Sequence, residues 1–269
     1  MDTIGFIGAG NMAEALIRGI INAGVCKPKY VFINDIRSDR LQFLSSQYRV
    51  QAVVNCAALA GQVDILVLSV KPQNMADVLL TIESVVRHGT LIISIAAGVR
   101  IAEITAALGD RPIIRVMPNT PALIGEGAIA LFANTRARAM MDKAMRIFSA
   151  VGKTVIVDNE DLIDVVTAVS GSGPAYFFSL MEEMIKAGQN MGLPAEITKI
   201  LVLQTAKGAA LLAVDKDRYG ESPSELRRKV TSPGGTTEAA LKVFATREFG
   251  QIIEQALRAA RDRSRELSG

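Results

Sequence analysis

A glycine-rich stretch near the start of the sequence has the residue types and spacing of a phosphate-binding turn. Gly8-Ala9-Gly10-Asn11-Met12-Ala13 follows the apolar run Ile4-Gly5-Phe6-Ile7 and opens an amphipathic segment. In this G-x-G-x-x-A pattern the first glycine permits a tight turn, the second lets the backbone approach a pyrophosphate, and the alanine lets the helix pack against the strand. Amides and the helix dipole then hold the phosphates. The stretch predicts a dinucleotide site, with a plain structural turn as the alternative.

The residues after the next apolar strand bear on which dinucleotide binds. The run Phe32-Ile33-Asn34 ends at Asp35, where the adenosine ribose of a dinucleotide would lie. An acid there accepts a hydrogen bond from the ribose 2′-hydroxyl and repels a 2′-phosphate, so Asp35 favours NAD. Arg37 and Arg40, with the polar Asn34, favour NADP, because guanidinium groups bind phosphate. Arg40 is equally consistent with a solvated helix position, and the pattern leaves both coenzymes open.

Two further turns follow predicted strands. Ser69-Val70-Lys71-Pro72 ends one strand with a proline that stops the hydrogen-bond ladder. Ile95-Ala96-Ala97-Gly98 ends the next strand with small residues that leave room for a nicotinamide ring or its ribose. Ligands of open α/β sheets bind outside the carboxyl ends of the strands. We therefore expect Lys71 to contact a coenzyme hydroxyl, with a surface position as the alternative.

The side chains that commonly transfer protons in reductases are scarce. His88 is the single histidine, and it precedes the predicted strand Thr90 to Ile95, so we expect it in solvent at the opposite edge of the sheet. No tyrosine is followed four residues later by a lysine. A carbonyl oxygen needs a proton donor as hydride arrives, whereas an iminium enters charged and leaves as a neutral amine. The composition therefore favours a C=N substrate over a C=O substrate.

Two loops in the second half are rich in small hydroxyl side chains. Ser170-Gly171-Ser172-Gly173-Pro174 separates two helix-length segments, and Thr231-Ser232-Pro233-Gly234-Gly235-Thr236-Thr237-Glu238 opens the last one. The amides and threonine hydroxyls of the second loop are suited to a carboxylate. Simple turns with capping residues are the alternative for both loops. The second loop offers more hydroxyls than one cap requires, which favours a binding role.

The spacing of apolar runs predicts the elements that position these residues. Short β-branched runs alternate with amphipathic segments as far as residue 158, which predicts βαβ units and a mostly parallel, Rossmann-type doubly wound sheet. The later segments are all of helix length, so we expect residues 1–158 to form a nucleotide-binding domain and residues 159–269 to form an all-helical second domain. Strands are predicted at Thr3 to Ile7, Tyr30 to Asn34, Asp64 to Val70, Thr90 to Ile95, Ile113 to Met117, Ala128 to Phe132 and Thr154 to Val157, and helices at Asp161 to Val169, Ala175 to Met191, Pro194 to Val214, Ser222 to Lys229 and Gly235 to Leu267.

Composition excludes several classes of protein. With 30 Lys+Arg against 27 Asp+Glu, the formal charge of +3 is too balanced for a nucleic-acid binder. No apolar run approaches the roughly 20 residues of a membrane span, and no secretory leader precedes the first strand, so we expect a cytoplasmic protein. Cys26 and Cys56 lack a CxxC pattern or a nearby histidine, so we expect neither a metal site nor a redox pair.

Six motifs together resemble those of the pyrroline-5-carboxylate reductase family, in the family's order along the whole chain. The last of them is close to the family's diagnostic signature. The motifs are Ile7-Gly8-Ala9-Gly10-Asn11-Met12, Ser69-Val70-Lys71-Pro72, Ile95-Ala96-Ala97-Gly98, Met117-Pro118-Asn119-Thr120-Pro121, Ser170-Gly171-Ser172-Gly173-Pro174-Ala175-Tyr176 and Val230-Thr231-Ser232-Pro233-Gly234-Gly235-Thr236-Thr237.

The resemblance implies reduction of the C=N bond of 1-pyrroline-5-carboxylate to L-proline by NAD(P)H, the last step of proline biosynthesis. It places the substrate carboxylate at Thr236 and Thr237, with Thr237 near the ring nitrogen as the catalytic residue, and adds Glu160 and Lys229 to the substrate site. Lys229 departs from the asparagine of some relatives. The coenzyme residues that it implies, together with Asp35, are Ile7, Gly8, Ala9, Gly10, Asn11, Met12, Asn34, Asn55, Ser69, Val70, Lys71, Pro72, Ile95, Ala96 and Ala97.

The resemblance also implies that residues 1–158 bind NAD(P) and that the helical residues 159–269 form the substrate and dimerisation domain of a homodimer, with rings of dimers in many members. A β-hydroxyacid dehydrogenase-like oxidoreductase is the alternative enzyme, because that family shares the glycine-rich start and a helical second domain. Its catalytic lysine follows the second glycine loop, where this chain has Ala175-Tyr176-Phe177-Phe178 and no lysine before Lys186. An NAD(P)-sensing binding protein is a further alternative, which would not need the loop from Ser232 to Thr237.

Overall fold

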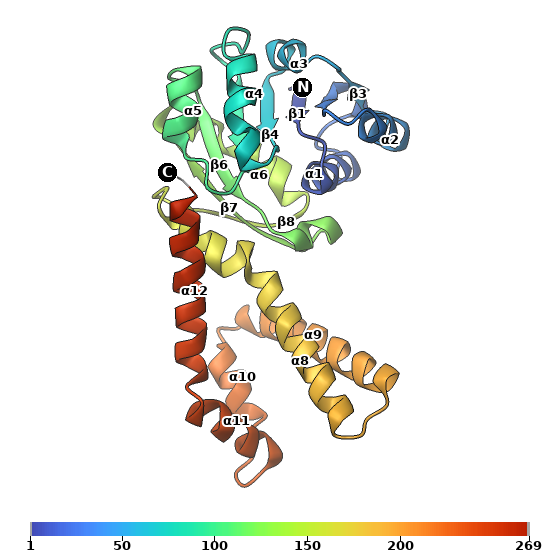
Figure 1. Ribbon diagram of the computed structural model, residues 1–269, viewed down its shortest axis with the longest axis vertical. Helices are drawn as coiled ribbons and strands as arrows, with labels where there is room; N and C mark the ends of the chain where they lie inside the picture. Colours follow the sequence, from blue (N-terminus) through green and yellow to red (C-terminus); the bar gives the residue numbers. More distant parts are fainter. Residues whose placement is uncertain (1, 268–269) are drawn as a thin grey trace. The chain divides into compact units, whose positions relative to one another are not determined.

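The computed structural model describes residues 2–267 and divides into two compact units (Figure 1). The first unit contains the chain up to Pro174 and, in addition, the chain from Arg258 on. The second unit is Ala175–Leu257. The chain therefore leaves the first unit within one helix, α8 (Gly173–Asn190), and returns to it within another, α12 (Phe249–Glu266).

The first unit is built on an eight-stranded sheet with the order β3-β2-β1-β4-β5-β6-β7-β8. All neighbouring strands are parallel except β6 and β7, which confirms the predicted mostly parallel, doubly wound sheet. The two-residue strand β3 has no counterpart among the predicted strands. The strands are β1 Ile4–Ile7, β2 Val31–Asn34, β3 Gln51–Ala52, β4 Ile65–Leu68, β5 Leu91–Ser94, β6 Ile113–Met117, β7 Gly127–Ala133 and β8 Gly152–Ile156.

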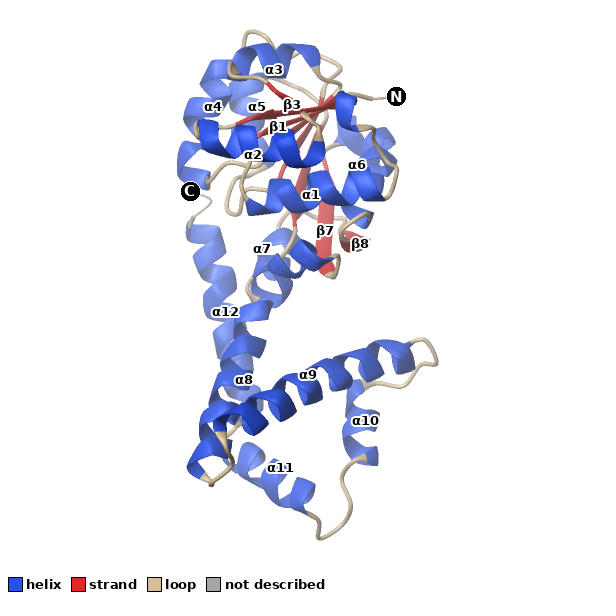
Figure 2. Ribbon diagram, turned by 90° about the vertical axis from the view of Figure 1, so that its right-hand side faces the viewer, coloured by secondary structure: helices blue, strands red, loops and turns tan. Residues whose placement is uncertain are grey.

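Helices cover both faces of this sheet, as Figure 2 shows. Successive side chains of a strand point to opposite faces, so Ile65 and Val67 of β4 belong to one core cluster while Leu66 and Leu68 belong to the other. The first cluster packs against α1, α2 and α6, and the second against α3, α4 and α5. These helices are α1 Asn11–Asn22, α2 Ser38–Tyr48, α3 Cys56–Gln62, α4 Met75–Ile82, α5 Ile101–Leu108 and α6 Met141–Ser149.

The helices after β8 differ from the predicted segments in two places. They are α7 Leu162–Val166, a π-helical turn Thr167–Gly171, α8, α9 Ala195–Asp217, α10 Pro223–Lys229, α11 Thr236–Thr246 and α12. The predicted loop Ser170–Pro174 is thus helical, and its Ser172 amide donates to the carbonyl of Thr167 at 2.8 Å. The predicted segment from Gly235 to Leu267 is two helices, because the backbone turns left-handed at Glu248, with φ 55°.

The division into units also differs from the predicted boundary at residue 158. Helix α7 lies with the sheet, because its Asp164 is buried and paired with Arg115 of β6. The end of α12 joins the same unit through a hydrogen bond from the Ser264 hydroxyl to Asp164, 2.9 Å long. The contacts therefore place residues 159–174 and 258–267 with the sheet and leave α9, α10, α11 and most of α8 in the second unit.

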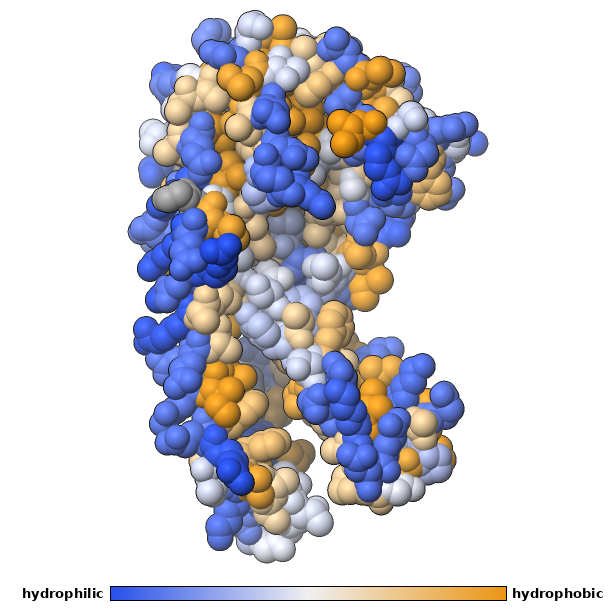
Figure 3. Space-filling model, in the orientation of Figure 1, coloured by the Kyte–Doolittle hydropathy of each residue, from blue (hydrophilic) through white to orange (hydrophobic). Residues whose placement is uncertain are grey.

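The helices of the second unit expose many large apolar side chains, several of which are visible in the lower part of Figure 3. By length and composition α9 is also apolar enough to cross a membrane, which the sequence analysis did not anticipate, and only 11% of that stretch is buried. Members of this exposed apolar set on α8 and α9 are Phe177, Phe178, Leu180, Met184, Ile197, Ile200, Leu201, Leu203, Leu211, Leu212 and Val214.

Candidate functional site

The carboxyl ends of four neighbouring strands lie level in the sheet. Ile7 at the end of β1 lies beside Asn34 of β2 and Leu68 of β4, and Leu68 lies beside Ser94 of β5. Strands β2 and β3 lie on one side of β1, and β4 and the later strands lie on its other side. The strand order therefore reverses at β1. Ligands of open α/β sheets bind at such a switch point. The glycine-rich turn and the turns that begin at Ser69 and Ile95 therefore share one edge of the sheet.

The two glycines of the G-x-G-x-x-A turn are needed for different reasons. Gly8 has φ +91°, and a Cβ there would lie 2.6 Å from the carbonyl oxygen of Ser69. Its amide donates to Asn34 at 2.8 Å, and the Ser69 hydroxyl donates back to the carbonyls of Ile7 and Gly8. A Cβ on Gly10 would meet nothing within 4 Å. Gly8 is thus required by the protein itself, whereas Gly10 leaves open space in front of the α1 amides, where a pyrophosphate fits.

The Asp35 carboxylate lies against the glycine-rich turn. One oxygen accepts from the amide of Ala9 at 2.6 Å, and the other accepts from the amide of Arg37 at 2.9 Å. Asn34 is buried and donates to the carbonyls of Val53 and Val54, at 2.8 and 2.9 Å. These bonds fix the end of β2 and hold a negative charge where the ribose of a dinucleotide is expected.

The Arg40 side chain binds other groups of the protein. Its guanidinium donates to the carbonyl of Ala9 at 2.7 Å and pairs with Glu14 of α1, whose other oxygen accepts from the Tyr48 hydroxyl at 2.8 Å. Burial raises the pKa of Glu14, but the hydrogen bonds from Arg40 and Tyr48 and the Arg40 charge outweigh it, so this pKa lies below its ordinary value. Arg37 is exposed and pairs with Asp39. The solvated position considered for Arg40 is therefore not the one observed.

The other predicted coenzyme residues differ in their surroundings. Asn55 caps α3, its side-chain oxygen accepting from the amide of Ala58 at 2.8 Å, and is otherwise exposed. Lys71 and Pro72 are exposed just past the end of β4, while Val70 is partly buried. In the loop after β5, Ala96 is buried, and Ile95 and Ala97 are partly exposed. All of these lie in turns after strands: the turns at Ser69 and Ile95 follow strands that the sequence predicts, whereas Asn55 follows the unpredicted strand β3.

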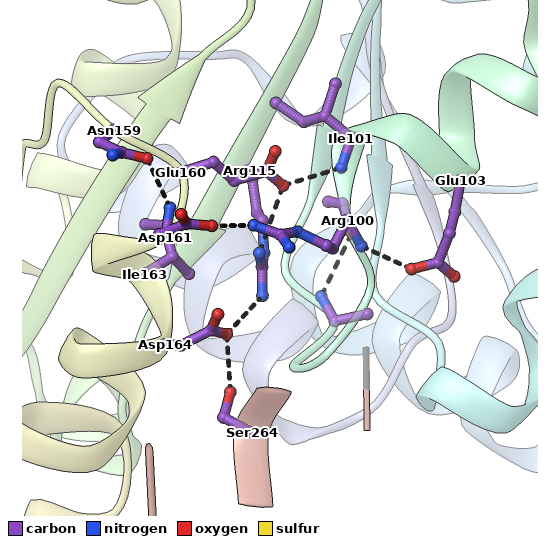
Figure 4. Close-up of polar contacts among 12 residues, drawn as sticks. Arg100, Ile101, Glu103, Arg115, Asn159, Glu160, Asp161, Ile163, Asp164 and Ser264 are labelled. Carbon is purple, nitrogen blue, oxygen red and sulfur yellow. Dashed lines mark hydrogen bonds and ion pairs between the residues drawn. The ribbon is translucent and has the colours of Figure 1, made fainter. Parts of the chain in front are cut away.

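A cluster of mostly buried charged side chains joins β6 to α7 and to the start of α5 (Figure 4). Arg115 of β6 is 1% exposed and pairs with Glu160 at 3.2 Å and Asp164 at 3.3 Å. Glu160 also accepts from the amide of Ile101 at 2.8 Å, and Asp164 accepts from the Ser264 hydroxyl. Sequence reasoning assigned no role to Arg115, Asp164 or Ser264. One feature of the sequence could have indicated this cluster: Arg115 is a single charged residue inside the apolar strand Ile113-Ile114-Arg115-Val116-Met117, and a buried charge needs a partner.

The predicted substrate residues fall in different parts of the chain. Glu160 lies in the first unit, in the cluster just described, and Lys229, Thr236 and Thr237 lie in the second. Lys229 is exposed and pairs with Glu221 at 2.7 Å. Thr236 is the first residue of α11, and its N-cap, Gly235, has no side chain to cap the helix. The first-turn amides of α11 have no intrahelical acceptor, so they are available for an anion.

The histidine and the two cysteines, the other side chains with reactive groups, lie in the first unit. His88 is exposed in the turn before β5. Cys26 is buried and Cys56 is partly buried, and burial raises the pKa of both thiols. Within residues 2–267, no three or more His, Cys, Asp and Glu side chains are grouped so that they could hold a metal ion.

Comparison with known proteins identifies the family. Residues 160–267 match the model for the pyrroline-5-carboxylate reductase dimerisation domain, and residues 3–98 match the model for coenzyme F420-dependent NADP oxidoreductases. The pyrroline-5-carboxylate reductase of Pseudomonas aeruginosa is 45% identical over 98% of this chain and 96% of its own.

Two solved structures agree along the whole chain. The pyrroline-5-carboxylate reductase of Coxiella burnetii has a TM-score of 0.93 with 37% identity, covering 100% of this chain and 99% of its own. The pyrroline carboxylate reductase of Plasmodium falciparum, solved with NADP bound, has a TM-score of 0.87 with 31% identity, covering 100% of this chain and 98% of its own. The full-length matches favour the main interpretation over the β-hydroxyacid dehydrogenase alternative. The chain belongs to the pyrroline-5-carboxylate reductase family.

Proposed function

We propose that the protein transfers hydride from NAD(P)H to the C=N carbon of 1-pyrroline-5-carboxylate and forms L-proline, the last step of proline biosynthesis. The observation that carries this proposal is the sequence identity of 45% to the pyrroline-5-carboxylate reductase of Pseudomonas aeruginosa, which extends over 98% of this chain. The turn Gly8–Met12 supports it independently, because its open space and unpaired helix amides suit the pyrophosphate of a dinucleotide.

The coenzyme is held by the turns at the carboxyl edge of the sheet. The amides that open α1 hold the pyrophosphate, Asp35 faces the adenosine ribose, and the loop Ile95–Ala97 lines the nicotinamide side. NADP and NAD both fit this description, since Asp35 favours NAD while Arg37 is exposed beside it. When bound, the reduced nicotinamide supplies the hydride. The role of the protein is to hold the acceptor carbon close to it and to exclude water.

The substrate carboxylate binds at the start of α11. The amides of Thr236 and Thr237 and their hydroxyls surround the anion, and the Thr237 hydroxyl lies close to the ring nitrogen. The carboxylate of Glu238 accepts from the amide of Gly234 at 2.6 Å and so shapes this turn. The protonated C=N group accepts hydride at carbon, where a C–H bond forms, while the electron pair of the C=N π bond moves to nitrogen. Nitrogen keeps its proton, so the product is a neutral amine and no strong protein acid is needed. Glu160 and Lys229 complete the proposed substrate set.

A second copy of the chain covers the apolar side chains of the helical unit. Residues 160–267 match a dimerisation domain, and the exposed apolar set on α8 and α9 is what a homodimer would bury. Rings of dimers and a location in the cytoplasm belong to the same proposal.

The test is coenzyme oxidation by the purified protein. We expect 1-pyrroline-5-carboxylate to consume NADPH or NADH, measured by loss of the near-ultraviolet absorbance of the reduced coenzyme, with stoichiometric formation of proline. A 2-hydroxy acid with oxidised coenzyme and a 3-oxo acid with reduced coenzyme serve as controls. Turnover of either control substrate without turnover of the imine would overturn the proposal.

A further inference from the structure

The last turn of α12 and the residue after it contact the loop that follows β5. Gly98 is buried with φ +76°, and a Cβ there would lie 3.0 Å from the Cβ of Leu267 and 3.1 Å from its carbonyl oxygen. The backbone of residue 267 therefore lies directly on the loop Ile95–Gly98. A side chain larger than hydrogen at position 98 would separate the two segments.

A second, polar connection runs from α12 to the first residue of α5, three residues after Gly98. The Ser264 hydroxyl donates to Asp164, Asp164 and Glu160 both accept from Arg115, and Glu160 accepts from the amide of Ile101 (Figure 4). The Ile101 amide opens α5 and has no intrahelical acceptor, so Glu160 is its partner. Ser264 is 4% exposed and Asp164 1% exposed, so solvent does not substitute for these bonds.

Loss of the Ser264 hydroxyl would disturb the whole series of bonds. Asp164 would lose a donor in a buried position, and the charge of Arg115 is tolerated there only with both carboxylates in place. A shift of Arg115 moves Glu160, and a shift of Glu160 releases the amide of Ile101. Arg100, next to Ile101, is held by Asp161, which is adjacent to Glu160 in the chain.

We propose that Ser264 and Leu267 are positioning residues for the coenzyme, which hold the loop Ile95–Gly98 in the conformation that receives the nicotinamide side. The inference rests on the proposed coenzyme site. They act through other residues of the protein, Ser264 through Asp164 and Leu267 through Gly98. Their effect is to order the loop before binding, so that less conformational entropy is lost when the coenzyme binds.

The experiment compares Ser264→Ala with Arg263→Ala, a matched control in the same turn whose side chain is exposed and pairs with Glu266. Coenzyme affinity is titrated by the fluorescence of NADPH in the absence of substrate, and hydrogen exchange is followed in the peptide that spans residues 95–104. We expect Ser264→Ala to raise the Kd for NADPH by about 3- to 10-fold. It should also speed exchange at the amide of Ile101. Arg263→Ala should change neither, and Ser264→Thr, which keeps the hydroxyl, should restore affinity.

A second pair of chains tests Leu267 separately and covers the case in which Ser264→Ala does not fold. A chain that ends at Glu266 is compared with one that ends at Leu267. The shorter chain should bind NADPH more weakly and exchange faster in the loop, while the KM for the imine at saturating coenzyme stays the same. Unchanged Kd and exchange in both Ser264→Ala and the shorter chain would overturn the inference. Failure of the proposed function looks different, because the wild type would then bind NADPH without reducing the imine.

Discussion

At the scale of single residues, Asp35 is the side chain with most influence on the choice of coenzyme. Its carboxylate is held beside the glycine-rich turn by the amides of Ala9 and Arg37, and Arg40 is occupied by Glu14 and cannot neutralise an incoming 2′-phosphate. We expect Asp35→Ser to raise the ratio of kcat/KM for NADPH to that for NADH by at least about tenfold. Asp142→Ser, at an exposed acid on α6, is the control. Equal ratios in the two variants would contradict the role given to Asp35.

Thr237 carries the proposed contact with the substrate. Thr237→Val keeps the shape of the side chain and removes the hydroxyl, so we expect kcat/KM for the imine to fall by about 10- to 100-fold, the scale of one lost hydrogen bond to a charged group. The Kd for NADPH should change little. Thr246→Val is the control, because that hydroxyl donates to Lys242 at the far end of the same helix. Wild-type turnover in Thr237→Val would remove Thr237 from the site.

The Glu14 contacts predict a pH dependence of stability. The pKa of Glu14 in the folded protein lies below its ordinary value of 4.5, so the unfolded chain binds more protons as the pH falls below 4.5. The stabilisation of the folded protein by this carboxylate is therefore complete at neutral pH, and it is lost as the pH falls through the lowered pKa of Glu14. Urea unfolding should show that Glu14→Gln costs about 1 to 2 kcal/mol at pH 7 and progressively less in acid. A cost that is independent of pH would contradict this assignment.

Residues that act through the backbone were easier to predict than residues that act through long-range side-chain contacts. The glycine-rich turn is local, so Gly8 and Gly10 were predicted from the strand-turn-helix pattern, and Asp35 from its place directly after the next strand. The partners Arg115, Asp164 and Ser264 are far apart in the sequence, and their pairing depends on how β6, α7 and α12 pack. A charged residue in an apolar strand indicates that a partner must exist, but not which residue it is.

At the scale of elements, the two glycines in the turn between β1 and α1 have different roles: Gly8 is needed for folding, and Gly10 is proposed to be needed for binding the coenzyme. A Cβ on Gly8 would collide with Ser69 in a backbone region that favours glycine, so Gly8→Ala should destabilise the protein by about 1 to 3 kcal/mol. Gly10→Ala places its methyl group in open space and should leave the urea midpoint within experimental error. If the pyrophosphate lies there, Gly10→Ala should still raise the Kd for NADPH by tenfold or more. Wild-type affinity in Gly10→Ala would place the pyrophosphate elsewhere.

Most elements were predictable because each has a local pattern. Strands β1, β4 and β5 are largely apolar runs that are buried along their whole length, and the seven predicted strands agree in position with the observed ones to within a few residues. Strand β3 is only two exposed residues and has no such pattern. The break between α11 and α12 has no glycine or proline at Glu248 to mark it, and the rings of Phe244 and Phe249 stack across it, 5.2 Å apart. Tertiary contacts of this kind are not readable from periodicity.

At the scale of the whole molecule, the exposed apolar side chains of the helical unit predict that it associates with a second copy of the chain. Ile200 on α9 is 65% exposed and belongs to the apolar set defined above. We expect the wild type to sediment as a dimer or larger assembly and Ile200→Glu to shift toward the monomer, because a charge would be buried in the interface. Ile36→Glu, at a side chain that is 97% exposed in the first unit, is the matched control. Identical sedimentation of the wild type and Ile200→Glu would place the interface elsewhere.

The first unit is assembled from two separate pieces of chain, and this has a consequence for biosynthesis. Its final piece, which starts at Arg258, leaves the ribosome only after all of the second unit, Ala175–Leu257. At about 5 to 20 residues per second, Asp164 would wait for Ser264 for roughly 5 to 20 s after the sheet has been synthesised. During this interval Asp164 lacks the hydrogen bond that Ser264 donates to it in the folded chain. The nascent sheet unit therefore lacks this contact until Ser264 has emerged, and a chaperone that holds the unit over the same interval would raise the yield of folded protein.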